Sequence, residues 1–461
     1  MEQNQKNTTS PRTSVKVHSV LTIVSGTPVR KGSVCPLSPL DHAMAHHSLH
    51  LIFYYSCGSF DLDRIRPPLN DVLSLYPIVT GRLARDGDGN WHVKCTDAGV
   101  RTYLANADVS IDEWLRFAGA DDERLLSPWE DLPDDPHIWS PFRIQITEFE
   151  GGGTAVGLSC PHMLADPTSA TLLIKSWTEA LHHEPIAHPP LLHPLALKPP
   201  PATTTSITSP VYYAAKSTRS EPKKSPKMAS ATFCFLDSAI KKSLSEIQST
   251  FPDATPFDLL VALFWTRIAR VKRSTWDQTP SMSFCMDIRR RLQDPLPDGF
   301  FGNALHFSQL KVGAHELECG DLCNVAELVH CHVAGLDLQD EFWSAVDWLG
   351  SRKDGHGKFA SPFRMYGPEL TCVNMEHMIP DESESEPFMY MTQFVKGQKP
   401  VHVSCHVGNS EGEGLILVLP SPEGGLARRV AVMLPEEEMD RLVEDKVILS
   451  LEPTFLLSGR M

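Results

Sequence analysis

The sequence has no long apolar run. In 461 residues no stretch approaches the roughly 18 consecutive apolar residues that suggest a membrane-spanning helix, and the longest run, Leu259 to Trp265, is soon interrupted by Arg267. Residues 1–20 are polar and lack the apolar core of a secretory signal peptide. We therefore expect a soluble protein with no encoded membrane anchor.

Positive charge is also scarce. Lys and Arg number 42 against 57 Asp and Glu, which gives a formal net charge of -15. This balance argues against a nucleic-acid-binding surface, because such surfaces are basic. With 41% hydrophobic and 21% charged residues, the composition is otherwise that of an ordinary globular protein.

Cysteine spacing typical of zinc sites is missing as well. The sequence has 11 cysteines and no secretion signal, so we expect reduced thiols in the cytoplasm. One crowded region contains His315, Cys319, Cys323 and the run His330-Cys-His332, but it has no Cys-x-x-Cys pair. We interpret it as an amphipathic helix that carries small apolar cysteines, and we predict no metal site.

The patterns that are present divide the chain into two halves. Residues 1–13 are polar and predicted to be disordered, 14–184 form a predicted N-terminal domain, and 229–461 form a predicted C-terminal domain. Between them, 185–228 are rich in Pro, Thr, Ser and Lys, as in Lys198-Pro-Pro-Pro201. This composition predicts a crossover linker without packed structure.

Strand and helix patterns are mixed in both halves, which predicts an α/β fold. The apolar run 154–160 is ended by Pro161 and is predicted to be a buried strand. Apolar residues at helical spacing predict a helix of about four turns up to Leu181, with Asp166 and Pro167 at its N-cap and first position. In the second half we predict strands over 231–236, 281–288, 401–407, 414–419 and 428–434, and helices that begin near Asp237, Thr255 and Pro435.

His162 lies in the turn between this strand and this helix. A titratable imidazole at a strand end is a common catalytic arrangement, and it can accept a proton from an alcohol or an amine. A histidine held only by backbone hydrogen bonds is the alternative, and both interpretations stay open at this point. Pro167 disfavours helical geometry at Asp166, so we interpret Asp166 as a helix cap and not as the partner that orients His162.

Two neighbouring side chains offer a different nucleophile. The stretch Gly157-Leu-Ser-Cys-Pro161 begins like the nucleophile elbow of a hydrolase, but it ends in proline instead of glycine, and no helix starts directly after Ser159. Cys160 lies about 7 Å from His162 along an extended chain, which is too far for an easy hydrogen bond between the side chains. We favour neither alternative.

Several motifs, in the expected order, resemble the BAHD acyltransferases. The family hallmark is His-x-x-x-Asp, which matches His162 and Asp166 here. The similarity covers nearly the whole chain. The other matching stretches are Ser38–Asp41, Tyr76–Leu83, Thr255–Trp265, Asp287–Arg291 and Pro297–Asn303.

The resemblance implies two similar chloramphenicol-acetyltransferase-like α/β domains, joined by a crossover loop, with an active-site channel between them. Acyl-CoA enters from one face as the co-substrate and the acceptor enters from the other; no cofactor is expected. His162 is implied to be the general base, and Asp166 is implied to point away from it and to pair with Arg289. For the oxyanion of the reaction, Asn303 and the backbone near Gly302 are candidate donors, with a simple Gly-Asn turn as the alternative. We expect a monomer.

The chain departs from the family near its C-terminus. The family carries Asp-Phe-Gly-Trp-Gly before Lys-Pro in a loop that shapes the channel, whereas this chain has Phe394-Val-Lys-Gly-Gln-Lys-Pro400. Only Lys399 and Pro400 are retained, and they join Asn303 as candidate residues of the channel or the CoA side. The acidic run Asp381–Glu386 is interpreted as a solvated loop.

Together with Met365-Tyr-Gly-Pro-Glu-Leu370, the altered loop resembles the plant eceriferum/glossy branch of the family. That branch is linked to cuticular wax and is thought to help the condensing enzyme of the endoplasmic-reticulum elongase to extend very-long-chain acyl-CoAs. Two hypotheses follow. The first is an acyltransferase of wax or very-long-chain lipid metabolism, acting on a hydroxyl or amine with His162 as base. The second is a non-catalytic accessory protein of the condensing enzyme, which would bring a cytoplasmic protein to the endoplasmic reticulum.

Overall fold

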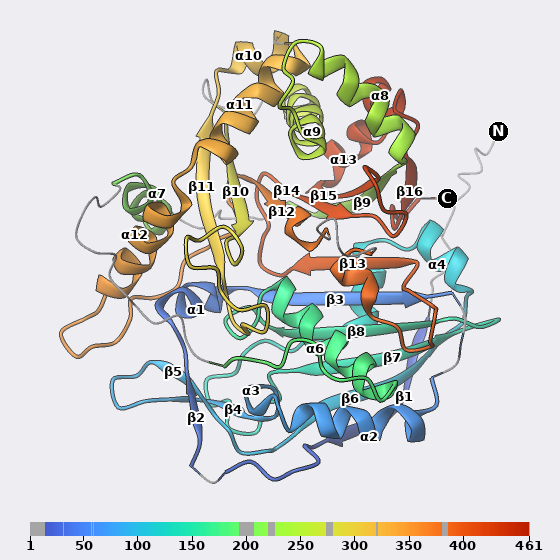
Figure 1. The fold of residues 1–461 in the computed structure, drawn as a ribbon, viewed down its shortest axis with the longest axis vertical. Coiled ribbons are helices and arrows are strands. Elements are labelled where there is room, and N and C mark those ends of the chain that lie inside the picture. The colour runs from blue at the N-terminus through green and yellow to red at the C-terminus, as the bar shows by residue number, and fades with distance from the viewer. Residues whose placement is uncertain are drawn as a thin grey trace, which may run out of the picture.

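A computed structural model describes residues 14–30, 32–56, 58, 60–192, 207–219, 226–272, 280–319, 321–379 and 386–460. Figure 1 shows two large β-sheets, one in the lower and one in the upper part of the view, each with helices packed on it. This arrangement confirms the predicted α/β class. None of the helices in the described ranges combines the length and the apolar character that crossing a membrane requires.

The lower sheet in Figure 1 comes mainly from the first half of the chain. Its β6–β7 pair is parallel and its other pairs are antiparallel. β8 is buried along its whole length, which confirms the predicted strand. In spatial order the strands are β1 (Val15–Ile23), β6 (Val100–Ala107), β7 (Arg143–Phe149), β8 (Thr154–Pro161), β3 (Ser48–Tyr55) and β13 (His402–Val407).

Helices cover this sheet on both faces. α2 (Leu62–Leu73) and α6 (Pro167–Leu181) pack together on one face, and Trp177 of α6 is buried there. α4 (Ile111–Phe117) contributes Trp114 to a smaller apolar core on the other face. Burial on both sides explains why β8 has a continuous apolar sequence and no alternation.

The upper sheet belongs to the second half. Its strands in spatial order are β11 (Leu305–Lys311), β10 (Ser281–Asp287), β12 (Leu370–Asn374), β14 (Leu415–Pro420), β15 (Arg428–Pro435), β9 (Met228–Phe235) and β16 (Thr454–Leu456). The longer helices of this half are α8 (Asp237–Gln248), α9 (Pro256–Lys272), α11 (Leu322–Gly335), α12 (Leu338–Ser351) and α13 (Glu436–Leu442). The strands and helix starts predicted for this half are all confirmed to within a few residues.

Short elements complete the fold. A small sheet is formed by β2 (Val34–Pro36), β5 (Trp91–Lys94) and β4 (Arg82–Arg85). The short helices are α1 (Pro39–Ala43), α3 (Pro77–Thr80), α5 (Ala120–Glu123), α10 (Ala314–Cys319) and α14 (Lys446–Leu449). The 3-10 turns are η1 (Met44–His46), η2 (Arg124–Leu126), η3 (Glu376–Met378) and η4 (Phe388–Met391).

Part of the predicted linker is folded. Helix α7 (Thr208–Ser217) lies inside the range 185–228 and packs against α12. It buries Tyr213, and the buried Lys216 donates to the carbonyl of Gly367 and forms an ion pair with Glu369. The expectation of a linker without packed structure is wrong here, because these partners lie about 150 residues away along the chain and the local composition does not reveal them.

One strand crosses between the two halves. β13 belongs by sequence to the second half, yet it pairs with β3 and completes the lower sheet. This pairing connects the two halves of the chain next to β8, whose C-terminal end precedes His162. The domain boundaries stay a prediction, and residues 1–13, predicted to be disordered, lie outside the described residues.

Candidate functional site

His162 lies between the end of β8 and the start of α6. Its backbone N–H donates to the carbonyl of His47 at 2.9 Å, which fixes the turn against the start of β3. The imidazole is fully buried, and its two ring nitrogens contact the side chains of Asn303 and Tyr366. His162 is therefore held by side chains from the second half of the chain and not by backbone alone.

Asn303 determines the tautomer of His162. Its Nδ2 lies 2.8 Å from Asp41 Oδ1 and 2.9 Å from the carbonyl oxygen of His162, and both of these oxygens are acceptors. The amide oxygen must then face the imidazole, so Nδ1–H of His162 donates to Asn303 Oδ1 at 3.0 Å. Nε2 is consequently unprotonated and can accept a proton.

Burial keeps this imidazole neutral. Loss of water around the ring lowers the pKa of His162 below its ordinary value, and the opposing effects of its hydrogen bonds and of the Asp166 carboxylate do not restore it. A neutral imidazole with a free lone pair is the form that a general base requires.

A protein hydroxyl occupies the position in front of this lone pair. Tyr366 donates to Nε2 at 3.1 Å, and its ring centroid lies 5.6 Å from that of the imidazole. His47 fixes the Tyr366 segment: its Nε2 accepts from the backbone N–H of Met365 at 3.0 Å, and its Nδ1 donates to the carbonyl of Gly408 at 2.9 Å. The site thus presents a hydroxyl to the base, but the hydroxyl belongs to the protein.

Asp166 caps α6 and forms an ion pair with Arg289. Its Oδ1 accepts the backbone N–H of Ser169 at 2.9 Å, and Oδ2 accepts that of Ala304 at 3.0 Å. Arg289 donates to the two carboxylate oxygens at 2.8 and 3.0 Å and also forms an ion pair with Asp287. All three charged groups are buried. The carboxylate of Asp166 is fully occupied by these structural contacts.

The structure contradicts an oxyanion role for Asn303 and Gly302. The Asn303 amide is used to hold His162 and Asp41, as described above. The backbone N–H of Gly302 donates to Ser169 Oγ at 3.0 Å. Neither group is free to stabilise a developing negative charge. Asn303 instead orients the base, a role that the sequence did not indicate.

The loop Phe394–Pro400 packs into the core of the lower half. The ring of Phe394 lies 4.7 Å from Trp177 and 4.9 Å from Phe60. Lys399 Nζ donates to Glu386 Oε1 at 3.1 Å and to the carbonyl of Pro422 at 2.7 Å. These contacts hold the loop itself, so a channel or CoA-side role for Lys399 and Pro400 stays a prediction. Of the predicted acidic loop, 381–385 lie outside the described residues.

The alternative nucleophiles are not supported. Ser159 Oγ donates to the carbonyl of Pro128 at 2.5 Å, and burial raises the pKa of the Cys160 thiol well above its ordinary value. In the His/Cys-rich region, Leu322–Gly335 form helix α11, with Cys323 buried. Within the described part of the chain, no group of three or more His, Cys, Asp or Glu side chains is placed to hold a metal ion.

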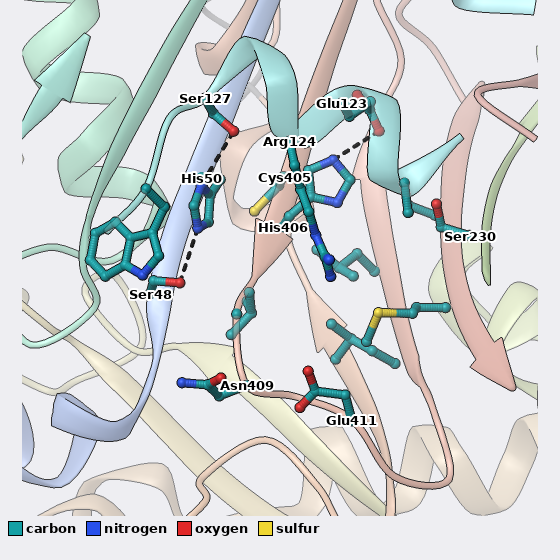
Figure 2. A pocket seen from close by; sticks show the side chains of 18 of the residues that line it. Ser48, His50, Glu123, Arg124, Ser127, Ser230, Cys405, His406, Asn409 and Glu411 are labelled. Atoms are coloured by element: carbon teal, nitrogen blue, oxygen red, sulfur yellow. Dashed lines mark hydrogen bonds and ion pairs between the residues drawn. The ribbon is translucent and has the colours of Figure 1, made fainter. Parts of the chain in front are cut away.

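A cavity of about 430 Å³ lies between the two sheets (Figure 2). It is bounded by β3 and β13 on one side and by β14 and β15 on the other. Ser48, which directly follows His47, and Gly408, whose carbonyl accepts from His47, both line it. The cavity therefore reaches the residues that hold the Tyr366 segment, and its size is that of a small-molecule site.

Two histidines face this cavity in different states. His50 lies between Ser48 Oγ at 3.0 Å and Ser127 Oγ at 3.3 Å, and burial lowers its pKa to about 3. His406 lies 2.9 Å from Glu123, whose charge outweighs the effect of burial and raises the pKa of His406. Sequence reasoning missed these residues, because they lie on different elements and form no local motif.

The fold and the site define a two-sheet α/β protein with a buried His-x-x-x-Asp turn between β8 and α6. Vinorine synthase has this fold, with a TM-score of 0.70 at 18% identity, over 95% of this chain and 98% of that chain. TRI101 of F. sporotrichioides, solved with coenzyme A and T-2, has a TM-score of 0.69 at 15% identity, over 92% and 100% of the two chains. At these identities the likeness concerns the fold.

Sequence comparison then establishes the family. The family model described as Transferase family matches residues 13–448, so the chain belongs to the BAHD acyltransferases, as its motifs predicted. A hydroxycinnamoyltransferase of Narcissus pseudonarcissus is 28% identical, over 85% of this chain and 90% of its own length. Protein ECERIFERUM 26-like of Arabidopsis thaliana is 23% identical, over 91% and 92%. The relatives therefore include both hydroxycinnamoyltransferases and eceriferum proteins.

Proposed function

We propose that the protein transfers an acyl group from acyl-CoA to a hydroxyl or amine acceptor, with His162 as the general base. The observation that supports this most directly is the geometry at Nε2. A neutral imidazole, oriented from behind by Asn303, accepts a hydrogen bond from a hydroxyl at 3.1 Å. An acceptor hydroxyl in the place of the Tyr366 hydroxyl would have the distance that proton transfer requires.

The reaction proceeds by attack on the thioester. Nε2 of His162 takes the proton of the acceptor as the acceptor oxygen or nitrogen bonds to the thioester carbonyl carbon. The carbon–sulfur bond then breaks, and the departing CoA sulfur takes the proton back from the imidazolium. Base and acid are thus the same residue, no cofactor is consumed, and acyl-CoA is the co-substrate.

Substitution of His162 tests this proposal. Purified protein is incubated with hydroxycinnamoyl-CoAs, long-chain acyl-CoAs and a panel of hydroxyl and amine acceptors, and the released CoA thiol is measured. We expect His162→Ala to lower kcat by about a hundred- to ten-thousand-fold, the usual contribution of a general base. The histidine His18, exposed on β1, provides the control, and His18→Ala should retain full activity. Equal turnover by His162→Ala and the unchanged protein would refute the role of His162.

The second candidate function is that of a non-catalytic accessory protein of the elongase condensing enzyme, acting in cuticular wax formation. Two observations favour it: Tyr366 closes off the fully buried His162, and the loop at Phe394 lacks the family's Asp and Trp. Under this proposal, co-expression with a condensing enzyme lengthens its acyl products, and His162→Ala lengthens them equally well. Unchanged product length on co-expression would eliminate it.

A further inference from the structure

Two cysteines of the small sheet lie with their sulfur atoms in contact. Cys35 of β2 is paired across the sheet with Val93 of β5, and Cys95 follows Val93 by two residues. Side chains two residues apart on a strand point to the same face, so both thiols project from the face that carries Val93. The backbone N–H of Cys95 donates to the carbonyl of Ser33 at 3.0 Å, which extends the pairing up to Cys95. The two sulfur atoms are 3.4 Å apart, and both thiols are free.

The distance between these thiols suits formation of a disulfide. A disulfide bond joins its sulfur atoms at about 2.0 Å, so these atoms must approach by about 1.4 Å. β2 can supply part of this movement, because it is three residues long and lies at the edge of its sheet. The residues on either side of Cys35, Val34 and Pro36, are exposed and do not anchor the strand in the core.

The hydrogen bond between the thiols favours Cys95 as the attacking sulfur. A hydrogen bond from the Cys35 thiol lowers the pKa of Cys95 below its ordinary value, against the opposing effect of burial. The same contact raises the pKa of Cys35. The thiolate is the form that reacts with an oxidant, and here it has a second thiol beside it.

Both sulfur atoms lie close to the surface of the protein. Cys35 is 8% exposed and Cys95 is 5% exposed. By contrast, Cys160, Cys285 and Cys372 are fully buried, and burial raises the pKa of each of these thiols. A small oxidant therefore reaches the pair more easily than it reaches the thiols of the core.

β2 leads directly into the residues that support His162. The strand ends two residues before Ser38, which caps α1 (Figure 1). Ser38 donates to Oδ2 of Asp41 from its backbone N–H at 2.8 Å and from its hydroxyl at 2.7 Å. Oδ1 of Asp41 accepts from Asn303, which orients His162. The position of Cys35 is thus connected to the imidazole through a short hydrogen-bonded path.

We propose that Cys35 and Cys95 form a redox site, at which a hydroperoxide reversibly produces a disulfide that disturbs the support of His162. The Cys95 thiolate attacks one peroxide oxygen and becomes a sulfenic acid. The other oxygen leaves as hydroxide and takes up the proton that the Cys95 thiol gave up. The Cys35 sulfur then displaces the hydroxyl from Cys95, and its thiol proton leaves with that hydroxyl as water.

In this reaction two thiols are oxidised to one disulfide, and one peroxide is reduced to two waters. A thiol reductant reverses the step. Cytoplasmic disulfides are commonly transient and redox-sensing, which agrees with such a reversible bond. The expected effect on turnover rests on the proposed function, whereas formation of the disulfide does not.

Peptide mapping tests formation of the bond. The full-length protein is reduced, treated with hydrogen peroxide, alkylated at its free thiols and digested. We expect the peptides that contain Cys35 and Cys95 to be linked, with a mass two hydrogens lower than their sum, and dithiothreitol to separate them. Cys35→Ser should abolish the link. Cys331→Ser, which removes an exposed thiol on α11, is the matched control and should retain it.

Two results of this mapping would overturn the proposal. One is alkylation of both cysteines after peroxide treatment, which would show that they remain thiols. The other is a link between two protein molecules in place of the link within one chain.

The connection to His162 is measured in two ways. Oxidation should lower kcat for acyl transfer at least about tenfold, because a displacement of about 1 Å in a supporting residue can cost about a hundredfold. Dithiothreitol should restore kcat, and Cys35→Ser should keep its kcat in peroxide. The Nδ1–H resonance of His162, identified by its loss in His162→Ala, should shift on oxidation.

An unchanged resonance in protein that carries the disulfide would refute the connection to His162. If the reduced protein transfers no acyl group to any acceptor, the proposed function fails. The peptide map and the resonance then still decide the redox site, because neither depends on turnover.

Discussion

Under the proposed function, the Tyr366 hydroxyl competes with the acceptor for Nε2 of His162. An acceptor must displace that hydroxyl from Nε2 before the base can take a proton. A neutral hydrogen bond contributes about 1 kcal/mol, so Tyr366→Phe should lower the KM for the acceptor about fivefold and leave kcat unchanged. Steady-state kinetics with the acceptor varied would measure both.

The control for this prediction is another buried tyrosine with a hydroxyl partner. Tyr76 contacts Ser176 at 2.9 Å, away from His162, and Tyr76→Phe should leave KM unaffected. Loss of turnover in Tyr366→Phe alone would mean that its hydroxyl takes part in the chemistry instead of blocking it.

At the scale of a single element, the start of α6 depends on the charge of Asp166. Asparagine caps helices as well as aspartate does, so Asp166→Asn keeps the cap and removes the charge that faces Arg289. Breaking a buried ion pair costs about 3–5 kcal/mol. We expect the lower end, about 3 kcal/mol, because Asp287 still faces Arg289. Urea unfolding measures the difference.

A cap outside the site gives the comparison for this prediction. Asp321 caps α11 by accepting from the backbone N–H of Cys323 and forms no ion pair with any described residue. Asp321→Asn should therefore change stability by no more than about 0.5 kcal/mol. If both substitutions had the same small effect, the ion pair of Asp166 would contribute nothing to the stability of the fold.

The elements around the site were predictable to different degrees. The strand β8, the cap and the helix α6 are local features, and their sequence pattern is continuous from 154 to 181. The contacts of His162 are not local: Asn303 and Tyr366 lie 141 and 204 residues away along the chain. The pairing of Asp166 with Arg289 was expected only because the family resemblance implied it. Helix α7 was missed because its packing partners are equally remote.

At the scale of the whole molecule, burial of histidines makes stability depend on pH. For several histidines, burial is the main cause of a pKa below the ordinary value. They are His42, His47, His50, His162, His306, His332, His377 and His402. His406 has a raised pKa, as do the carboxyls of Asp41 and Glu376, and these few groups act in the opposite sense.

The direction of the effect follows from proton uptake. Below about pH 6.5 the unfolded chain protonates these histidines, whereas the folded protein keeps them neutral to lower pH. Their contribution to stability is therefore complete above pH 6.5 and is lost as the pH falls below it. For His50, with a pKa of about 3, the loss at pH 5 is about 2 kcal/mol.

His306 provides the sharpest measurement of this effect. It is fully buried, and neither ring nitrogen has a hydrogen-bond partner among the described residues. Burial lowers its pKa to about 4, and the titratable groups that act on it are Glu341 and His332. We expect the free energy of unfolding to fall by several kcal/mol from pH 7 to pH 5, and His306→Leu to reduce that fall by about 2 kcal/mol. Exchange of the exposed His18 for Gln should not alter it. Equal stability of the unchanged protein at the two pH values would show that the buried histidines take up protons without unfolding.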